Sequence, residues 1–215
     1  MTYLDLINRV LARLRETQVS TPTDTEYSTL VGYLVNDAKK VVETAWDWSA
    51  LRTTKTVQVT SATNSYTITG SGQDYKILDA YNATQKTRLK LISTNEMNTK
   101  INLNTAAVGV PEVFSFNGID SNGDQNIVVY PTPDGSYDLN FDMVIREGEL
   151  SDANDVTKLP SHPIIMYAWS FATRERGETG GTAAQEIFGI ADRALADAVS
   201  LDAAKYSVEL NWRPA

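Results

Sequence analysis

Hydrophobic residues at both ends of the chain repeat every three to four positions, which is the spacing of one helix face. One stripe covers residues 6–14 after the capping residue Thr2, and a second covers residues 30–45 after a Thr23–Glu26 capping-box spacing. Near the carboxyl terminus, Pro163 precedes a stripe over residues 164–172, and Thr182 precedes another over residues 188–202. The patterns predict four long helices, two from each end of the chain.

The period changes to two between residues 51 and 150. Short runs of alternating apolar and polar residues are separated by turns rich in Gly, Asn and Pro, which is typical of an antiparallel sandwich or barrel with six or more strands. Ser93 and Glu96 have a capping spacing that predicts a short helix within this region. The clearest strand pattern consists of Tyr137, Leu139, Phe141, Met143 and Ile145.

These patterns predict an α+β fold in which a four-helix bundle, built from both chain ends, carries an inserted antiparallel β lobe resembling a sandwich or barrel. We expect the bundle at residues 1–50 and 160–206 and the β-rich lobe at residues 51–150. Residues 207–215 have no helical period and end in large apolar residues, so we expect an extended tail.

Composition excludes several kinds of chemistry. The net charge is −8, which argues against binding to the outside of nucleic acid, because phosphate contacts need a basic excess. The chain has no cysteine and a single histidine, His162, which exclude disulfides, iron–sulfur clusters and histidine-rich metal centres. The amino terminus lacks a secretory pattern and no stretch is long and apolar enough to span a bilayer, so we expect cytoplasmic folding. We expect no cofactor.

Oxygen-bearing side chains at alternate positions of residues 120–126 resemble the start of a calcium loop. The match fails at Gln125, where a calcium loop has glycine, and at Pro131, where it has glutamate. A polar hairpin turn explains this segment better, and a weak ion site there stays open.

Other candidate chemistry is equally weak. Two carboxylate pairs, Asp134 with Asp138 and Asp142 with Glu147, are better explained as solvated hairpin residues than as glycosidase groups. Ser161 and His162 are adjacent in sequence, and neighbouring residues rarely align a hydroxyl with an imidazole. The Gly70-Ser71-Gly72 segment lacks the Lys and Ser/Thr of a phosphate loop. No catalytic site is predicted.

Tryptophans mark two candidate contact regions. Trp46 and Trp48 lie two residues apart and cannot share a helix face, so we expect one in the core and the other against the β lobe or a partner. Trp212 lies three residues from the chain end, where little of the domain remains to bury it. It reads as an anchor in a neighbouring subunit or partner, with folding back onto its own helix as the alternative.

Three stretches together resemble head-to-tail adaptor proteins of short-tailed bacteriophages, also called tail tubular protein A or gatekeeper. They are residues 45–52; residues 109–116 with 128–135; and residues 159–160 followed by 168–172 and 174–178. The resemblance covers the layout of about the whole chain, and its motifs are structural rather than catalytic.

The resemblance implies a non-enzymatic subunit of a ring, expected to be a dodecamer, that docks under the portal and presents a surface to the tail nozzle protein. The genome passes through its channel, and a negatively charged chain would repel the DNA backbone rather than bind it. The expected partners are the portal protein, the nozzle protein and copies of the chain, with no membrane involved. We expect the virion head–tail junction as its location, after assembly in the host cytoplasm.

In this interpretation the tail at residues 207–215 is the main candidate for contact with the portal or an adjoining subunit. Its candidate contact residues are Val208, Leu210, Trp212 and Arg213. Further possible interface residues are Arg9, Arg13, Trp48, Arg174 and Arg176.

Two other classes of function stay open. One is a receptor- or carbohydrate-binding virion module, in which Tyr66, Tyr75, Tyr81 and Tyr137 would stack on sugars, although alternating tyrosines more often belong to a sheet core. The other is a wall-degrading glycosidase. The single histidine and the lack of a placed carboxylate pair argue against an enzyme.

Overall fold

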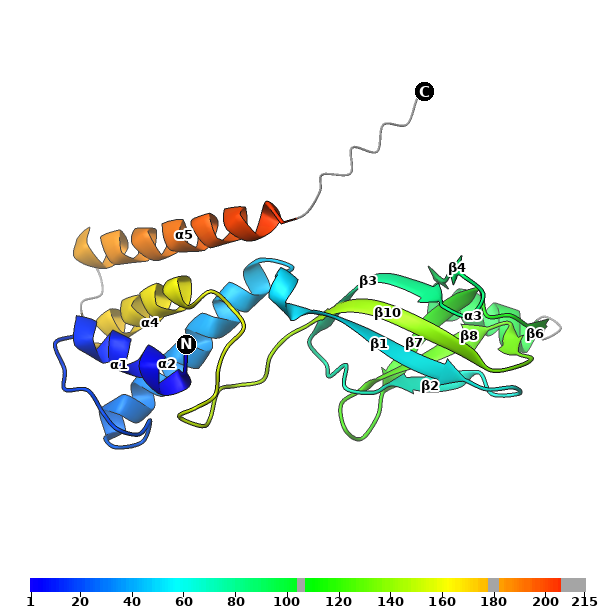
Figure 1. Cartoon of the computed structure of the whole chain (residues 1–215), viewed down its shortest axis with the longest axis horizontal. Coiled ribbons are helices and arrows are strands. Elements are labelled where there is room, and N and C mark those ends of the chain that lie inside the picture. Colours follow the sequence, from blue (N-terminus) through cyan, green and yellow to red (C-terminus); the bar gives the residue numbers. More distant parts are fainter. Residues whose placement is uncertain (104–106, 178–181, 206–215) are drawn as a thin grey trace, which may run out of the picture. The chain divides into compact units, whose positions relative to one another are not determined.

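The structure is a computed structural model that describes residues 1–103, 107–177 and 182–205, and it describes side chains within the last range from residue 185 onward. The chain divides into two compact units (Figure 1). The helical unit comprises Met1–Leu51 and Glu147–Ala215, and the β unit comprises Arg52–Arg146. The fold is a mixed α+β fold, with helices from both ends of the chain in one unit.

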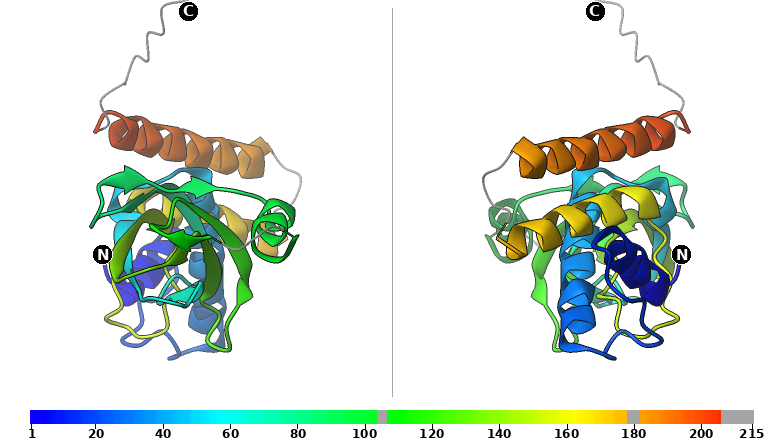
Figure 2. Two further views of the ribbon diagram at one scale, coloured as in Figure 1. Left: turned by 90° about the vertical axis from the view of Figure 1, so that its right-hand side faces the viewer. Right: turned by 90° about the vertical axis from the view of Figure 1, so that its left-hand side faces the viewer.

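The helical unit contains α1 (Tyr3–Arg13), α2 (Glu26–Ala45), α4 (Ser161–Glu175) and α5 (Thr182–Ala203). The first three pack against one another, whereas α5 packs mainly on α4, so that α4 lies between α5 and the other two helices (Figure 2). The unit is therefore a group of three helices with a fourth laid on one member, rather than the expected four-helix bundle. Short alanine side chains of α5, including the buried Ala191 and Ala194, are small enough for two helices to approach closely.

Local hydrogen bonds determine where the first two helices begin. Thr2 caps α1 and forms the expected capping box with Asp5. The predicted Thr23–Glu26 box is wrong, because Thr25 and Ser28 cap α2 instead. The reason lies in Asp24, whose carboxylate accepts backbone N–H groups of the preceding turn and so ends that turn just before the helix.

The β unit has two four-stranded sheets. The first has the order β1 (Arg52–Val59), β10 (Tyr137–Ile145), β3 (Tyr75–Asn82) and β4 (Thr87–Arg88). The second has the order β2 (Ser65–Ile68), β8 (Gln125–Tyr130), β7 (Val113–Ile119) and β5 (Lys90–Leu91). Pairing is antiparallel except between β5 and β7 and between the short strands β6 (Val108–Gly109) and β9 (Thr132–Pro133). Shorter helical segments are η1 (Ser49–Leu51), α3 (Thr94–Asn98) and η2 (Thr99–Leu103).

Side chains from both sheets form one hydrophobic core, so the unit is a sandwich and not a closed barrel. Phe141 of β10 meets Phe114 of β7 edge to face, with ring centroids 5.3 Å apart. The residues of β10 that alternate in sequence are those that point inward, as the period of two predicts: Tyr137, Leu139, Phe141 and Met143 are all buried. The predicted Ser93 cap is also present, since Ser93 Oγ accepts the Glu96 N–H at the start of α3.

Candidate functional site

The predicted interface residues Arg9, Arg13 and Arg174 are exposed on the helical unit. Arg9 and Arg13 lie on α1, and Arg174 lies in the last turn of α4. Arg13 donates to the backbone carbonyl of Arg9 (3.2 Å), and with this bond both residues remain exposed. Exposed guanidinium groups of this kind are available to a partner, although each surface ion pair would contribute little energy.

Arg176 has a different role, because it joins parts of its own unit. Its guanidinium donates to Glu16 (2.6 Å) and to the Tyr27 hydroxyl (2.7 Å), and it lies over the Tyr27 ring at 4.6 Å. The hydrogen bond to Glu16 raises the pKa of Arg176 above its ordinary value. The side chain therefore links the end of α4 to the loop after α1 and to α2, and it is not a free interface group in the single chain.

Trp48 is buried rather than exposed, which corrects its place among the interface residues. Its side chain is 1% exposed and its indole N–H donates to the Val42 carbonyl (2.8 Å). Trp46 is the solvent-facing member of the pair at 36% exposure. As expected, one indole lies in the core and the other at the surface. The buried one is Trp48, which was predicted as a possible interface residue, and the exposed one is Trp46.

The candidate tail residues Val208, Leu210, Trp212 and Arg213 lie outside the residues that the structure describes. What is described is the end of α5 from which that tail continues. Asp202, which is 4% exposed, accepts the backbone N–H (2.9 Å) and the hydroxyl of Ser49, and Lys205 donates to Asp202 at 2.8 Å. The last turn of α5 is thereby fastened to the segment that leaves α2.

We expect Asp202→Asn to destabilise the protein by about 1–2 kcal/mol at neutral pH, because the charge-assisted bonds to Ser49 and Lys205 are weakened. Burial alone would raise the pKa of Asp202, but the bonds from Lys205 and Ser49 together lower it. A lowered pKa adds stability above the unfolded-state pKa of about 3.9, and that stability disappears as pH falls through the folded-state value. Urea unfolding from pH 7 to pH 3 should show the two proteins converging in acid. The exposed Asp197→Asn is the control, and a pH-independent difference for Asp202→Asn would contradict this account.

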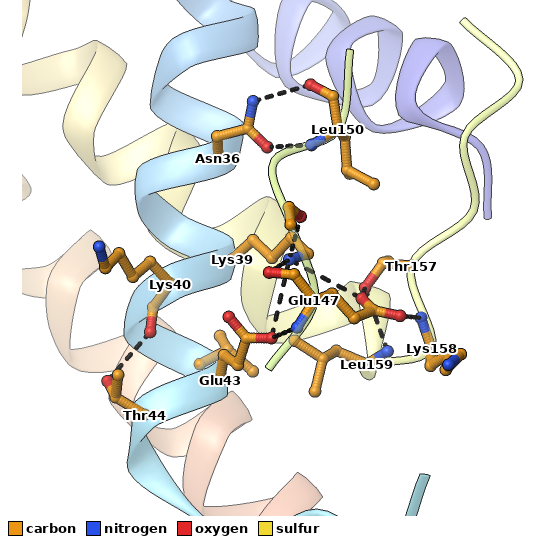
Figure 3. Close-up of polar contacts among 12 residues, drawn as sticks. Asn36, Lys39, Lys40, Glu43, Thr44, Glu147, Leu150, Thr157, Lys158 and Leu159 are labelled. Carbon is orange, nitrogen blue, oxygen red and sulfur yellow. Dashed lines mark hydrogen bonds and ion pairs between the residues drawn. The ribbon is translucent and has the colours of Figure 1, made fainter. Parts of the chain in front are cut away.

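A buried ionic cluster joins α2 to the segment after β10, and the sequence pattern did not predict it (Figure 3). Lys39 is 3% exposed and lies 3.8 Å from carboxylate oxygens of both Glu43 and Glu147. Its ammonium group also donates to the backbone carbonyls of Glu147 (3.3 Å) and Gly148 (2.9 Å). Glu43 in turn accepts the backbone N–H of Glu147.

The cluster fixes the segment that follows β10. The Glu147 carboxylate accepts the Thr157 hydroxyl (2.9 Å) and the Lys158 N–H (3.0 Å), which ties the two ends of this loop together. One turn earlier on α2, the Asn36 side chain makes paired hydrogen bonds with the backbone of Leu150 (2.9 and 3.0 Å; Figure 3). Only the Lys39–Glu43 spacing of four residues is visible in the sequence, and such pairs are usually exposed.

The acidic hairpin at residues 120–126 uses its side chains for the turn itself. Asp120 accepts the N–H groups of Asn122 and Asp124 (both 2.8 Å). Asp124 accepts the N–H groups of Gly70 (2.8 Å) and Gly72 (2.9 Å), which lower its pKa. Across residues 1–103, 107–177 and 182–205, no three metal-binding side chains gather in one place. The glycine-rich segment therefore surrounds a carboxylate of the chain itself.

The carboxylate pairs are likewise engaged separately. Asp134 accepts the Tyr137 hydroxyl, Asp142 accepts the Thr54 hydroxyl, and Glu147 belongs to the buried cluster. His162 is exposed in the first turn of α4, with no hydrogen bond to Ser161 in the described part of the chain. None of these groups forms a catalytic arrangement within the described residues.

The four tyrosines proposed for sugar stacking do not share a surface. Tyr137 is 8% exposed, and Tyr66 and Tyr75 pack against the sandwich core. Their hydroxyls bond internally, Tyr66 to the carbonyls of Thr60 and Thr63, and Tyr75 to Gln125 (2.7 Å). The β3–β10 pairing shifts its register between Tyr75 and Tyr81, which interrupts the alternation of faces along β3. The Tyr81 hydroxyl accepts a hydrogen bond from the side chain of Asn140 on β10.

No helix in the part of the chain that the structure describes is long and apolar enough to cross a membrane.

A comparison with curated proteins gives no match. The model of the SU10 adaptor protein family matches residues 1–213, which is nearly the full length of the chain. The chain therefore belongs to the SU10 adaptor protein family and is a phage structural adaptor, a virion component with a role at the head–tail junction.

Proposed function

We propose that the chain is a non-enzymatic subunit of a ring that joins the portal to the tail nozzle of a short-tailed phage and allows the genome to pass. The family match over residues 1–213 carries this proposal. The engaged carboxylates and the exposed His162 are consistent with a protein that works through its surfaces. We expect the ring to be a dodecamer that lies under the portal, as in gatekeeper proteins. Each copy would complete its interfaces beside its neighbours.

The portal side of this proposal rests on the end of α5 and the tail beyond it. Asp202 holds the last turn of α5 to Ser49, so the chain emerges from an anchored position. The following residues include Val208, Leu210 and Trp212, large apolar side chains of the type that anchor interfaces, with Arg213 after them. These residues would contact the portal or an adjoining subunit.

Ring closure requires a second set of contacts between copies. Arg9, Arg13 and Arg174 are exposed cations on a chain whose net charge is −8, so an acidic face of the neighbouring copy would complement them. Such ion pairs would determine how neighbouring copies align, and they would contribute little to the free energy of association. The same negative charge would let double-stranded DNA slide through the channel without specific binding.

Deleting residues 207–215 should leave a folded chain that captures the portal much more weakly. Trp212→Ala alone should weaken portal capture by up to about 30-fold, since losing a tryptophan anchor, whether it contacts the portal or an adjoining copy of the ring, typically costs about 2 kcal/mol. Pull-down with the cognate portal measures capture, and helical circular dichroism confirms folding. Tyr33→Ala, which removes an aromatic side chain that is 63% exposed on α2, is the matched control. Portal capture that is unchanged by the deletion would eliminate the tail as the contact.

A further inference from the structure

One edge of the β sandwich is open and largely apolar. A groove of about 460 Å³ is lined by Tyr75 and Ile77 of β3, Leu91 of β5, and Phe116 and Ile119 of β7, together with the polar side chains of Gln73 and Gln125. Leu91 and Ile119 are 51% and 52% exposed, so the groove presents two large aliphatic side chains to solvent. The ring centroids of Tyr75 and Phe116 lie 6.3 Å apart, and both rings pack against the sandwich core. The aromatic residues of the groove are therefore continuous with that core.

The groove exists because the second sheet is incomplete on this side. The β5 strand pairs only with Val113 and Phe114, although β7 continues to Ile119. The Lys90 and Ile92 N–H groups donate to the carbonyls of Glu112 and Phe114, so even-numbered residues of β7 direct their backbone groups toward β5. By the same alternation Phe116 directs its backbone groups to this side, where no strand of the described chain pairs with it. The helix α3, which follows β5 in the chain, also contacts β7, and the edge beside Phe116 that stays open offers room for a short added strand.

The sequence of this chain contains a segment that matches such a gap. Residues 206–212 read Tyr-Ser-Val-Glu-Leu-Asn-Trp, in which apolar and polar side chains alternate without exception. In an extended conformation Val208, Leu210 and Trp212 would lie on one face, while the polar residues would lie on the other. The segment would span roughly 20 Å, enough to place two or three apolar side chains in the groove.

Charge agrees with this pairing. Glu209 is the only charged residue of the segment and belongs to its polar face. Lys90, which alternates with the groove residue Leu91 on β5, is exposed and belongs to the side facing away from the groove. A strand added with its apolar face inward would therefore bring unlike charges to the same outer side.

We propose that the groove of one copy binds residues 206–212 of a second copy as an added strand. This names the adjoining subunit as the partner of the apolar tail, and it rests on the proposed function in that the ring supplies the second copy. Strand addition provides backbone hydrogen bonds at the open edge, and alternate side chains filling the groove provide specificity.

Because the natural chain has no cysteine, single cysteines can test this contact without background. Leu210→Cys and Ile119→Cys variants that carry tags of different mass are mixed with the cognate portal under oxidising conditions. We expect the 210–119 disulfide dimer to form on the order of tenfold faster than a 210–190 dimer made with Ile190→Cys, a 43% exposed residue of α5, because binding raises the local thiol concentration. Equal rates for the two pairs would overturn the proposal, as would a monomeric disulfide in the Ile119→Cys/Leu210→Cys double variant.

A peptide of residues 205–215 gives an independent measurement on a chain ending at residue 205. We expect the labelled peptide to bind this chain, with Leu91→Asp weakening binding at least about tenfold and the exposed Leu201→Asp leaving it unchanged. Absence of peptide binding would reject the groove as the site. Portal capture by the full chain is measured alongside the peptide assay. If only the groove proposal is wrong, the full chain still captures the portal. If the ring proposal is wrong, portal capture is absent.

Discussion

Replacing Lys39 by methionine should destabilise the helical unit by about 3–5 kcal/mol, because the change leaves the buried carboxylate of Glu43 and the partly buried carboxylate of Glu147 without their shared cation. The methionine would fill much of the same volume, so the loss would be electrostatic rather than a cavity effect. The ammonium group also holds two backbone carbonyls at the start of the loop after β10, and these acceptors would lose their donor. Urea unfolding followed by helical circular dichroism measures the change in free energy.

The neighbouring Lys40 provides the matched control. It lies on the same helix but is exposed, so Lys40→Met should change the stability by less than about 0.5 kcal/mol. Wild-type stability in Lys39→Met would mean that the cluster in Figure 3 does not hold the loop, and the explanation of how residues 147–158 are positioned would have to be abandoned.

The second large effect is expected at Trp48. Trp48→Ala should cost about 3–5 kcal/mol, because it removes a fully buried aromatic side chain and the hydrogen bond from its indole to the Val42 carbonyl. The same unfolding measurement applies. Trp46→Ala, two residues away and 36% exposed, should cost less than about 1 kcal/mol. The reverse order of the two effects would show that the indoles have been assigned to the wrong environments.

Periodicity was sufficient to locate the four long helices and the central strand, because helices and strands bury residues at characteristic spacings. The stripe beginning at Leu6 belongs to α1, and the alternation around Phe141 belongs to the central strand β10. The start of α2 was misplaced by two residues, since Thr23 and Thr25 both satisfy a capping pattern and the choice is made by the Asp24 turn. Such competition between local hydrogen bonds is not visible in spacing alone.

The candidate surface residues could be predicted only by type. Arg9 and Arg176 look alike in the sequence, but Arg176 is committed to Glu16 and Tyr27, which lie about 150 positions away. The Lys39–Glu147 contact joins residues over 100 positions apart, and no single-sequence pattern links them. The open edge beside Leu91 depends on the short length of β5, a feature that the alternation of apolar and polar residues does not determine.

Imaging a mixture of the full chain and the cognate portal by electron microscopy tests the central claim most directly. Our account predicts a closed ring of copies seated on one face of the portal, with a channel that continues the portal channel. A chain that stays unattached in the presence of assembled portal, or that decorates another part of the particle, would contradict it.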